Sequence, residues 1–292
     1  MTPALLIGLS LCLPLAGALG AEILGADVSQ GPDEATFEQI FAALMEYGVL
    51  IIRDQDLTPA QQKAFCQRIG DPVPVPFVKT LDDHPEIIAI IKEADERTDS
   101  VFGGTWHTDF SFLPAPPKAS CLYGREIPSF GGDTLFASMT KAYENLSPGM
   151  QDMLRDMKVV HSGKRSYGTT GTFANKQLDS IAVEATEAGD EEVLHPVVAV
   201  IPESGKRSLF VNDIYAIRFE NMTEEESAPL LNFLCGQARR PENLCRLDWQ
   251  QGSLAIWDNR TTMHYAVNDY DGQRREMHRV TISGEPLEGI QP

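Results

Sequence analysis

The chain of 292 residues is 42% hydrophobic and 23% charged, a composition typical of a globular protein, which excludes a disordered or collagen-like chain. With 42 acidic and 24 basic residues it has a formal net charge of −18, so phosphate backbones and anionic membrane surfaces would be repelled. We therefore expect a single domain over residues 1–292, with no nucleic-acid partner and no membrane partner.

The N-terminal segment raises the question of targeting. Residues Ala4 to Ala21 resemble the apolar region of a secretory signal, but no Lys or Arg precedes them, as a signal peptide normally requires. Pro14, Gly17 and Gly20 interrupt the segment, which is also too short for a membrane span. We expect Ala18 to Val28 to form the first strand of the fold instead.

Two early helices are marked by their apolar spacing and their caps. Apolar residues recur at i, i+3, i+4 and i+7 from Phe37 to Leu44, and Gly48 marks the end of this helix. In the second helix Thr58 is the expected N-cap, Pro59 occupies the first helical position, and Gly70 lies past the end. Further helices are expected after Ser147-Pro148 and at the capping box formed by Thr223 and Glu226.

Strands are predicted throughout the rest of the chain. The runs are Val49 to Ile52, Glu86 to Ile91, Ala119 to Tyr123, Ser253 to Trp257 and Met277 to Ser283. Helices that cluster early in the chain, followed by a strand-rich C-terminal part, indicate an α+β protein built on a central β-sandwich or barrel.

The polar stretch from Ser162 to Glu192 is rich in Gly and Thr, and loops of this length are often lids. We treat residues 162–192 as a possible lid.

The five cysteines are scattered, and none has the CxxC spacing of a zinc or redox site. They are Cys12, Cys66, Cys121, Cys235 and Cys245. An odd number without such spacing favours a reducing compartment, and we expect a cytoplasmic protein.

A candidate metal site centres on Trp106-His107-Thr108-Asp109. On an extended strand, residues i and i+2 project from the same face, so His107 and Asp109 could reach one ion. A second histidine, for which His264 is the candidate, would complete a facial triad of two imidazoles and one carboxylate, which leaves open positions on Fe(II). An isolated HxD pair is weak support, because a surface histidine near an acidic residue is common.

The wider context of this pair resembles a known family. From Leu19-Gly20-Ala21-Glu22, through the HxD pair and Gly131-Gly132-Asp133-Thr134, to the segment from Trp257 to Arg279, the chain is similar to the taurine dioxygenase and 2,4-dichlorophenoxyacetate dioxygenase family of Fe(II)- and 2-oxoglutarate-dependent oxygenases. The separations match the family, at 134 − 109 = 25 and 275 − 264 = 11 residues. The resemblance implies a double-stranded β-helix, or jelly-roll, core with flanking helices.

The resemblance also implies a role for each site residue. It makes His107, Asp109 and His264 the iron ligands. Thr134 and Arg275 would bind the distal carboxylate of 2-oxoglutarate, and Arg279 would bind the anion of the substrate, since a guanidinium binds a carboxylate or sulfonate through two charge-assisted hydrogen bonds. If Arg275 and Arg279 share a strand, their spacing of four places them on one face. Arg274 belongs to the same sequence cluster.

The expected reaction is hydroxylation of a small carboxylate- or sulfonate-bearing molecule, with release of succinate and CO2 and with possible C–O or C–S cleavage. Retention of Asp109 implies hydroxylation, since related halogenases replace this carboxylate. Taurine enzymes carry an Asn where this chain has Gly103, and the segment from Gly70 to Phe77 is closer to the aryloxypropionate (dichlorprop) branch. Phe77, Phe102, Phe110 and Phe112 could line an apolar wall, although phenylalanines are more often plain core.

Two other classes of protein fit part of the same pattern. A zinc hydrolase could use the same triad, and a non-catalytic jelly-roll could bind without reacting. The remaining histidines, His84, His161, His195 and His278, are expected to be structural or solvent-facing. Asp258 and Asn259 are expected to shape the turn before His264. We also expect a homo-oligomer.

Overall fold

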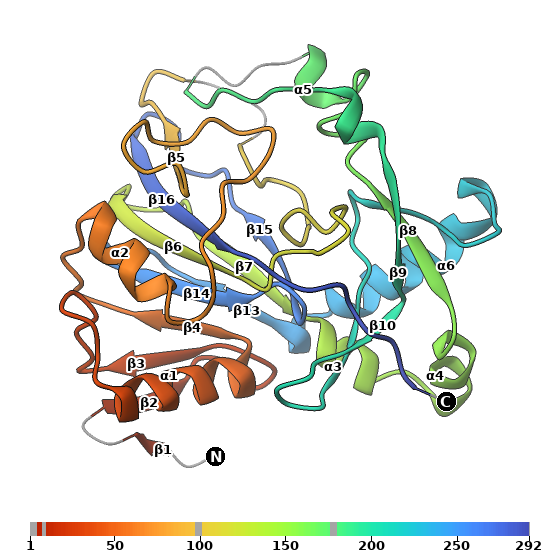
Figure 1. Cartoon of the computed structure of the whole chain (residues 1–292), viewed down its shortest axis with the longest axis horizontal. Helices are drawn as coiled ribbons and strands as arrows, with labels where there is room; N and C mark the ends of the chain where they lie inside the picture. The colour runs from red at the N-terminus through yellow and green to blue at the C-terminus, as the bar shows by residue number, and fades with distance from the viewer. Residues whose placement is uncertain (1–4, 8–9, 97–100, 176–179, 292) are drawn as a thin grey trace.

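An eight-stranded sheet forms the centre of the fold (Figure 1). The computed structural model describes residues 5–7, 10–96, 101–175 and 180–291. In spatial order the strands are β1 (Leu5–Ile7), β2 (Ser10–Pro14), β3 (Ala21–Leu24), β4 (Val49–Ile52), β14 (Leu254–Asp258), β6 (Ala119–Glu126), β16 (Arg275–Ile282) and β5 (Ile87–Lys92). Strands β3 and β4 are parallel, and the other neighbours pair antiparallel.

Smaller sheets complete the β-structure. One has the order β13 (Leu244–Leu247), β7 (Thr134–Ser138), β15 (Thr262–Ala266), and a second has the order β12 (Ala216–Phe219), β8 (Lys158–Ser162), β9 (Glu192–Pro196). Strands β10 (Val198–Val200) and β11 (Arg207–Leu209) form a hydrogen-bonded pair. All these pairings are antiparallel.

Several helices begin or end at caps that the sequence marks. The helices are α1 (Glu34–Tyr47), α2 (Pro59–Cys66), α3 (Met139–Glu144), α4 (Pro148–Leu154), α5 (Thr172–Asn175) and α6 (Glu224–Ala238), with 3-10 turns at Glu187–Asp190 and Pro241–Asn243. Gly48 ends α1 with a left-handed backbone, and capping boxes at Thr58 and Thr223 open α2 and α6. Helix α2 ends four residues before Gly70, because residues 67–69 form turns and not a further helical turn.

Alternate residues of the large sheet pack into two different cores. Leu50 and Ile52 of β4 lie in a cluster with Ile40 of α1, whereas Val49 and Ile51 lie in a cluster with Phe136 of β7, Trp257 of β14 and Leu247 of β13. The period-2 pattern of β4 therefore places helices on one face of the sheet and the β13-β7-β15 sheet on the other. This layering is the β-sandwich with flanking helices that the sequence predicts.

The N-terminal segment forms part of the large sheet. Strand β3 covers Ala21–Leu24, which is shorter than the strand expected from Ala18 to Val28, because Gly20 and Gly25 flank it with left-handed backbone conformations (φ 87° and 75°). Strand β2 pairs with β3 along residues 11–14, while residues 1–4 and 8–9 lie outside the described part. Among the described residues, no helix combines the length and apolar character needed to cross a bilayer.

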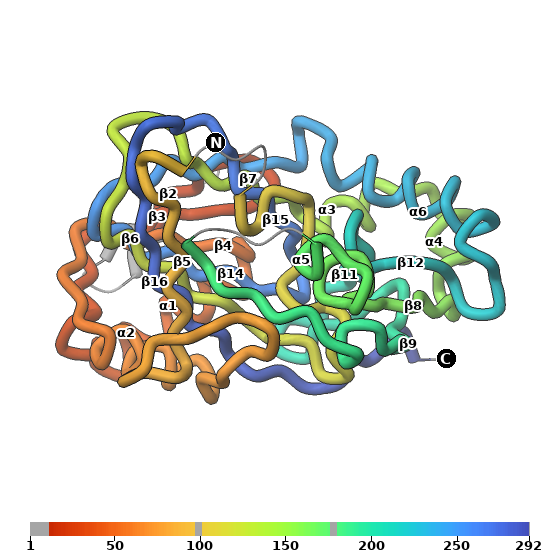
Figure 2. The backbone as a smooth tube through the Cα atoms, turned by 90° about the horizontal axis from the view of Figure 1, so that it is seen from above, coloured from red at the N-terminus to blue at the C-terminus, as the bar shows by residue number. Residues whose placement is uncertain are grey.

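The polar stretch from Ser162 to Glu192 connects β8 to β9. It contains α5 and the turn at Glu187–Asp190, and residues 176–179 lie outside the described part. Seen from above, α2 lies toward one end of the molecule and α6 toward the other, with α5 between them (Figure 2).

Candidate metal centre and adjoining cavity

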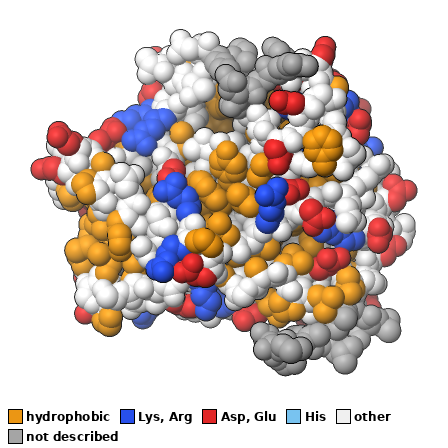
Figure 3. Space-filling view, turned by 180° about the vertical axis from the view of Figure 1, so that it is seen from behind, with side chains coloured by type: hydrophobic (Ala, Val, Ile, Leu, Met, Phe, Trp, Pro, Cys, Tyr) orange, Lys and Arg blue, Asp and Glu red, His pale blue; other side chains and the backbone are white. Residues whose placement is uncertain are grey.

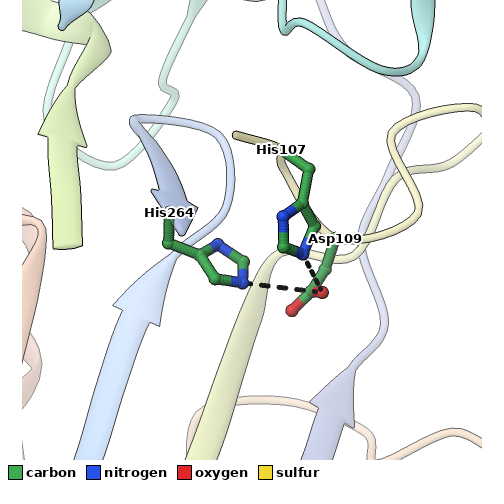
Figure 4. Close-up of side chains that lie close together, drawn as sticks. All are labelled: His107, Asp109 and His264. Carbon is green, nitrogen blue, oxygen red and sulfur yellow. Dashed lines mark ion pairs between the residues drawn. The ribbon is translucent and has the colours of Figure 1, made fainter. Parts of the chain in front are cut away.

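His107, Asp109 and His264 converge between the two main sheets. The backbones of His107 and His264 exchange hydrogen bonds of 3.0 and 2.8 Å, which places the two residues opposite each other. Nε2 of His107 lies 3.6 Å from Oδ1 of Asp109, and Nε2 of His264 lies 3.9 Å from the same oxygen (Figure 4). One ligand atom from each residue falls within 4.8 Å of the others, and all three residues are buried.

The backbone route to this convergence differs from the predicted one. His107 forms an isolated bridge to β15, and the chain turns immediately after Thr108. The premise that His107 and Asp109 lie on one extended strand is therefore wrong. Phe110, with φ 45°, belongs to this turn, which brings the Asp109 carboxylate to the imidazoles without strand geometry.

Both imidazoles have lone pairs available to a metal ion. Nδ1 of His107 lies 2.6 Å from the Thr105 carbonyl oxygen, which can only accept, so Nδ1 carries a proton and, in the neutral ring, the free lone pair is on Nε2. Burial, and then the nearby His107, lower the pKa of His264 well below its ordinary value. His264 is therefore neutral at physiological pH, as ligation requires. Two neutral imidazoles and a carboxylate fit Fe(II).

The Asp109 carboxylate is held on both of its oxygens. Nη1 of Arg279 lies 2.8 Å from Oδ1, and the Ser120 hydroxyl donates to Oδ2 at 2.7 Å. Burial raises the pKa of Asp109, but Arg279 and the two histidines lower it more, so it lies well below its usual range. Ser120 accepts from the Asn259 amide at 3.0 Å, so Asn259 does more than shape a turn. Ser120 is not among the residues predicted for the site, because nothing in its local sequence sets it apart.

The three clustered arginines have different surroundings. Arg275 and Arg279 lie on β16, whose pairing with β5 is regular, so both project from one face as their spacing predicts. Arg274 pairs instead with glutamates, at Glu93, Glu126 and Glu276. Arg275 is 6% exposed, its Nε has no hydrogen-bond partner, and the guanidinium has no ion pair with any residue that the structure describes. A buried guanidinium without a carboxylate partner is costly, which makes it a candidate site for an external anion.

Thr134 and Arg275 both contact Trp249. The Thr134 hydroxyl accepts from Nε1 of Trp249 at 3.0 Å, which leaves its own proton free to donate. The Arg275 guanidinium lies 5.9 Å from the Trp249 ring centroid. Ala266, which pairs with Thr134 across β7 and β15, lines a small cavity of about 20 Å³ together with Arg275. Trp249 was not among the predicted site residues.

A larger cavity of about 120 Å³ opens beside the metal centre. His107 and Asp109 lie in its wall, and its apolar lining includes Phe102, Phe110, Tyr167, Phe173, Ile214 and Tyr215. Two of the four predicted phenylalanines therefore line the cavity. Phe77 and Phe112 are not among the lining residues, but they pack against Tyr167, with ring centroids 5.1 and 5.6 Å from that of Tyr167. Tyr167 and Phe173 belong to the stretch from Ser162 to Glu192, so this stretch supplies part of the wall.

The remaining histidines lie outside the triad. His161 and His195 are buried and stand edge to face, with ring centroids 5.2 Å apart. His278 lies on the face of β16 opposite Arg275 and Arg279, with its Nε2 3.2 Å from Glu276. His84 is partly exposed in a bridged turn with Leu81.

The fold and the site define a protein of the non-haem metal dioxygenase class. A profile of the family described as "Taurine catabolism dioxygenase TauD, TfdA family" matches residues 12–281. A crystal structure of a taurine dioxygenase from Burkholderia xenovorans superposes with a TM-score of 0.79 and 31% identity, over 96% of this chain and 93% of that one. This chain belongs to the TauD/TfdA family, with its jelly-roll core.

Curated relatives are similar over nearly the whole chain. An alkylsulfatase from Acinetobacter baylyi is 38% identical over 94% of this chain and 85% of its own length. An alpha-ketoglutarate-dependent sulfate ester dioxygenase from Pseudomonas putida is 36% identical over 95% of this chain and 90% of its own length. An (S)-phenoxypropionate/alpha-ketoglutarate dioxygenase from Sphingobium herbicidovorans is 28% identical, with 94% of each chain covered. The protein is an Fe(II)- and 2-oxoglutarate-dependent dioxygenase that uses O2.

Proposed function

We propose that His107, Asp109 and His264 hold the Fe(II) of this dioxygenase, and that the adjoining cavity admits an alkyl sulfate ester. The observation that carries the metal assignment is the convergence of three buried ligand atoms within 4.8 Å of one another. The bound metal, 2-oxoglutarate and O2 together supply the oxidant that replaces a C–H hydrogen with a hydroxyl group, while 2-oxoglutarate becomes succinate and CO2. The residues of the chain bind the reactants, orient them and exclude water.

Arg275 and Thr134 are proposed to bind the distal carboxylate of 2-oxoglutarate. Arg275 is buried without an ion-pair partner among the described residues, and an entering carboxylate would compensate its charge. The hydroxyl oxygen of Thr134 accepts a hydrogen bond from Trp249. The hydroxyl can therefore donate its own proton to the same carboxylate.

Arg279 is proposed to bind the anion of the organic substrate. One of its nitrogens, Nη1, faces Asp109, whereas Nε and Nη2 have no partner among the described residues. The guanidinium lies 5.4 Å from the ring centroid of Phe110 and 5.6 Å from that of Phe102, and both rings line the cavity. An anionic head group could therefore bind at Arg279 while an apolar remainder contacts the aromatic wall.

The sulfate-ester assignment rests on the position of Arg279 beside the aromatic wall, together with the alkylsulfatase and the sulfate ester dioxygenase that are 38% and 36% identical to this chain. Hydroxylation at the carbon that bears the ester oxygen gives an unstable product, which breaks its C–O bond to release sulfate and leave an aldehyde. The cavity of about 120 Å³ is somewhat smaller than the ~150 Å³ cavity that takes up benzene, so a short alkyl chain would fit without rearrangement.

A screen of succinate release tests the substrate class. The purified enzyme, with Fe(II), ascorbate and 2-oxoglutarate, is offered an alkyl sulfate, the alkylsulfonate and the alkanoate of the same chain length, and an aryloxypropionate. We expect the alkyl sulfate to give the highest kcat/KM, with inorganic sulfate and aldehyde formed in equal amounts. A preference for the aryloxypropionate would instead support the branch indicated by the segment from Gly70 to Phe77.

Further proposals concern the location, assembly and partners of the protein. We propose a cytoplasmic homo-oligomer, in keeping with the free state of all five cysteines. We expect no nucleic-acid or membrane partner, because the net charge is −18 and, on the face seen from behind, Lys and Arg side chains lie scattered among apolar and acidic ones (Figure 3). We also propose that the stretch from Ser162 to Glu192 closes over bound substrate. Light scattering and proteolysis with and without substrate test the first and last of these proposals.

A further inference from the structure

Phe110 has a backbone conformation that bulky residues rarely adopt. Its φ of 45° lies in the left-handed region, where a side chain with a Cβ is disfavoured. The residue stands between Asp109 and Ser111 and is 2% exposed. A strained backbone of this kind persists only where the surrounding structure holds it, and it often marks a functional site.

Ser111, the next residue, is fixed by two side chains from distant parts of the chain. Its hydroxyl oxygen lies 2.9 Å from Nδ1 of His161 on β8 and 2.9 Å from Nδ2 of Asn212. Ser111 and His161 are completely buried, and Asn212 is 2% exposed. We call Ser111, His161 and Asn212 the serine clamp.

The hydrogen bonds of the serine clamp have a determined direction. Nε2 of His161 lies 3.2 Å from the Phe210 carbonyl oxygen, which can only accept, so Nε2 carries the proton and Nδ1 accepts from Ser111. Burial, and then His195, lower the pKa of His161 well below its ordinary value, which agrees with a neutral ring. The Asn212 amide nitrogen can only donate, so the Ser111 hydroxyl accepts there and donates to His161.

The same clamp reaches the wall of the cavity. Oδ1 of Asn212 accepts from the backbone N–H of Tyr215 at 2.8 Å, and Tyr215 lines the cavity beside His107 and Asp109. One continuous chain of hydrogen bonds therefore runs from Phe210 through Ser111 to Tyr215. It joins the turn that carries Asp109 to the segment that carries Tyr215. Connected buried networks of this kind can fix a single arrangement of the groups that they join.

We propose that Ser111 is a positioning residue, and that the serine clamp holds the strained turn at Phe110 so that the Asp109 carboxylate faces His107 and His264. The inference rests on the proposed role of Asp109 as a metal ligand. Outer contacts that orient metal ligands typically contribute about 10- to 100-fold to metal affinity. The clamp would contribute through the backbone, in addition to the direct contact of Ser120 with the carboxylate.

The first test compares Ser111→Ala with Ser227→Ala. Ser227 is also completely buried and makes two hydrogen bonds, with Thr223 and Phe219, but it lies on α6 away from the site. Both variants should lower the Tm. Only Ser111→Ala should weaken Mn(II) binding, by about 10-fold or more, and raise the amount of succinate formed per product. Equal Mn(II) affinities in the wild type and in Ser111→Ala would overturn the proposal.

A second test separates the strained turn from a general loss of packing. Glycine adopts the left-handed region without strain, so in a Phe110→Gly background the turn no longer depends on the clamp. Adding Ser111→Ala there should change Mn(II) affinity less than about threefold. The same loss in both backgrounds would contradict the proposed mechanism. If His264→Ala bound Mn(II) as tightly as the wild type, the metal assignment itself would fail, which distinguishes the two proposals.

Discussion

Nη1 of Arg279 lies 2.8 Å from Oδ1 of Asp109, the carboxylate oxygen that also faces both histidines of the triad. The side chains of this pair are 4% and 2% exposed, so solvent screens their interaction little. Arg279 therefore contacts the metal centre and lies near the aromatic wall, and its Nε and Nη2 have no partner among the described residues. Its loss should affect both sites, and different substitutions should separate the two effects.

Arg279→Leu should weaken binding of the organic substrate by about 30-fold or more, because removing one partner of a buried charged contact costs about 2–5 kcal/mol. Its KM for 2-oxoglutarate should stay within about threefold of the wild-type value. Arg279→Lys keeps a charge near Asp109 but lacks the planar fork, so it should preserve Mn(II) affinity while still weakening substrate binding. Initial-rate kinetics and metal titration measure these quantities. Equal turnover of a neutral ester analogue would contradict the role of Arg279.

Arg275 and Arg274 form a matched pair for testing the 2-oxoglutarate site. Arg275→Leu should raise the KM for 2-oxoglutarate by about 30-fold or more, since a buried charged contact is lost. Arg274→Gln, which removes partly exposed ion pairs with Glu93, Glu126 and Glu276, should leave this KM within about twofold. Thr134→Val should have an intermediate effect, since it removes one hydroxyl donor worth about 1 kcal/mol. Unchanged KM values in Arg275→Leu and Thr134→Val would show that the cosubstrate binds elsewhere.

Glu203 should contribute stability that depends on pH. Burial raises its pKa, but Lys118 and Arg260 lower it more, which leaves a pKa of about 2 against an ordinary value of 4.5. A carboxyl whose pKa is lower in the folded state stabilises the fold above its unfolded pKa, and it loses this effect as the pH falls from about 4.5 to 2. Because the group is partly exposed, we expect Glu203→Gln to cost only about 1–2 kcal/mol at pH 7.

Urea unfolding of the wild type and Glu203→Gln at pH 7 and pH 3 measures this difference. The destabilisation should shrink at pH 3. Glu242→Gln, which removes an exposed pair with Arg240, is the control and should change the unfolding free energy by less than about 0.5 kcal/mol at either pH. An undiminished penalty for Glu203→Gln at pH 3 would mean that its carboxylate does not act through its charge.

Local patterns were sufficient where neighbouring residues decide the structure. The cap at Thr58 and the left-handed Gly48 follow from hydrogen-bonding capacity and backbone freedom within one turn. The common face of Arg275 and Arg279 follows from the period of a regular strand. These features could be predicted from the sequence because each depends on a few consecutive residues.

Long-range contacts explain what could not be predicted. The strand expected at His107 and Asp109 is a turn, and the contacts of Ser111 in that turn come from residues 50 and 101 positions away in the sequence. Ser120 reaches the Asp109 carboxylate from β6, and no spacing rule relates these two residues. A single sequence shows which residue types could bind a metal, but it does not show which buried hydroxyls support them.

Metal binding should stabilise the folded protein, because a ligand that binds only the folded state raises its stability by RT ln(1 + [L]/Kd), or about 2.7 kcal/mol at 100 times Kd. Mn(II) should therefore raise the Tm of the wild type and of His84→Ala, whose histidine lies outside the site. It should not raise the Tm of His107→Ala or His264→Ala, and both variants should form no succinate. Undiminished succinate formation by either variant would rule out the triad.

Asp109→Ala should behave differently from the histidine variants even without metal. Removing this carboxylate leaves Arg279 as a buried cation without its partner, which typically costs about 3–5 kcal/mol. His264→Ala leaves no charge unpaired, so metal-free Asp109→Ala should be the less stable of the two in urea unfolding. In the double variant Asp109→Ala/Arg279→Leu, the unpaired cation is gone and much of the stability should return, while succinate formation remains absent. If the double variant is no more stable than Asp109→Ala, the ion pair does not contribute to folding in the way proposed.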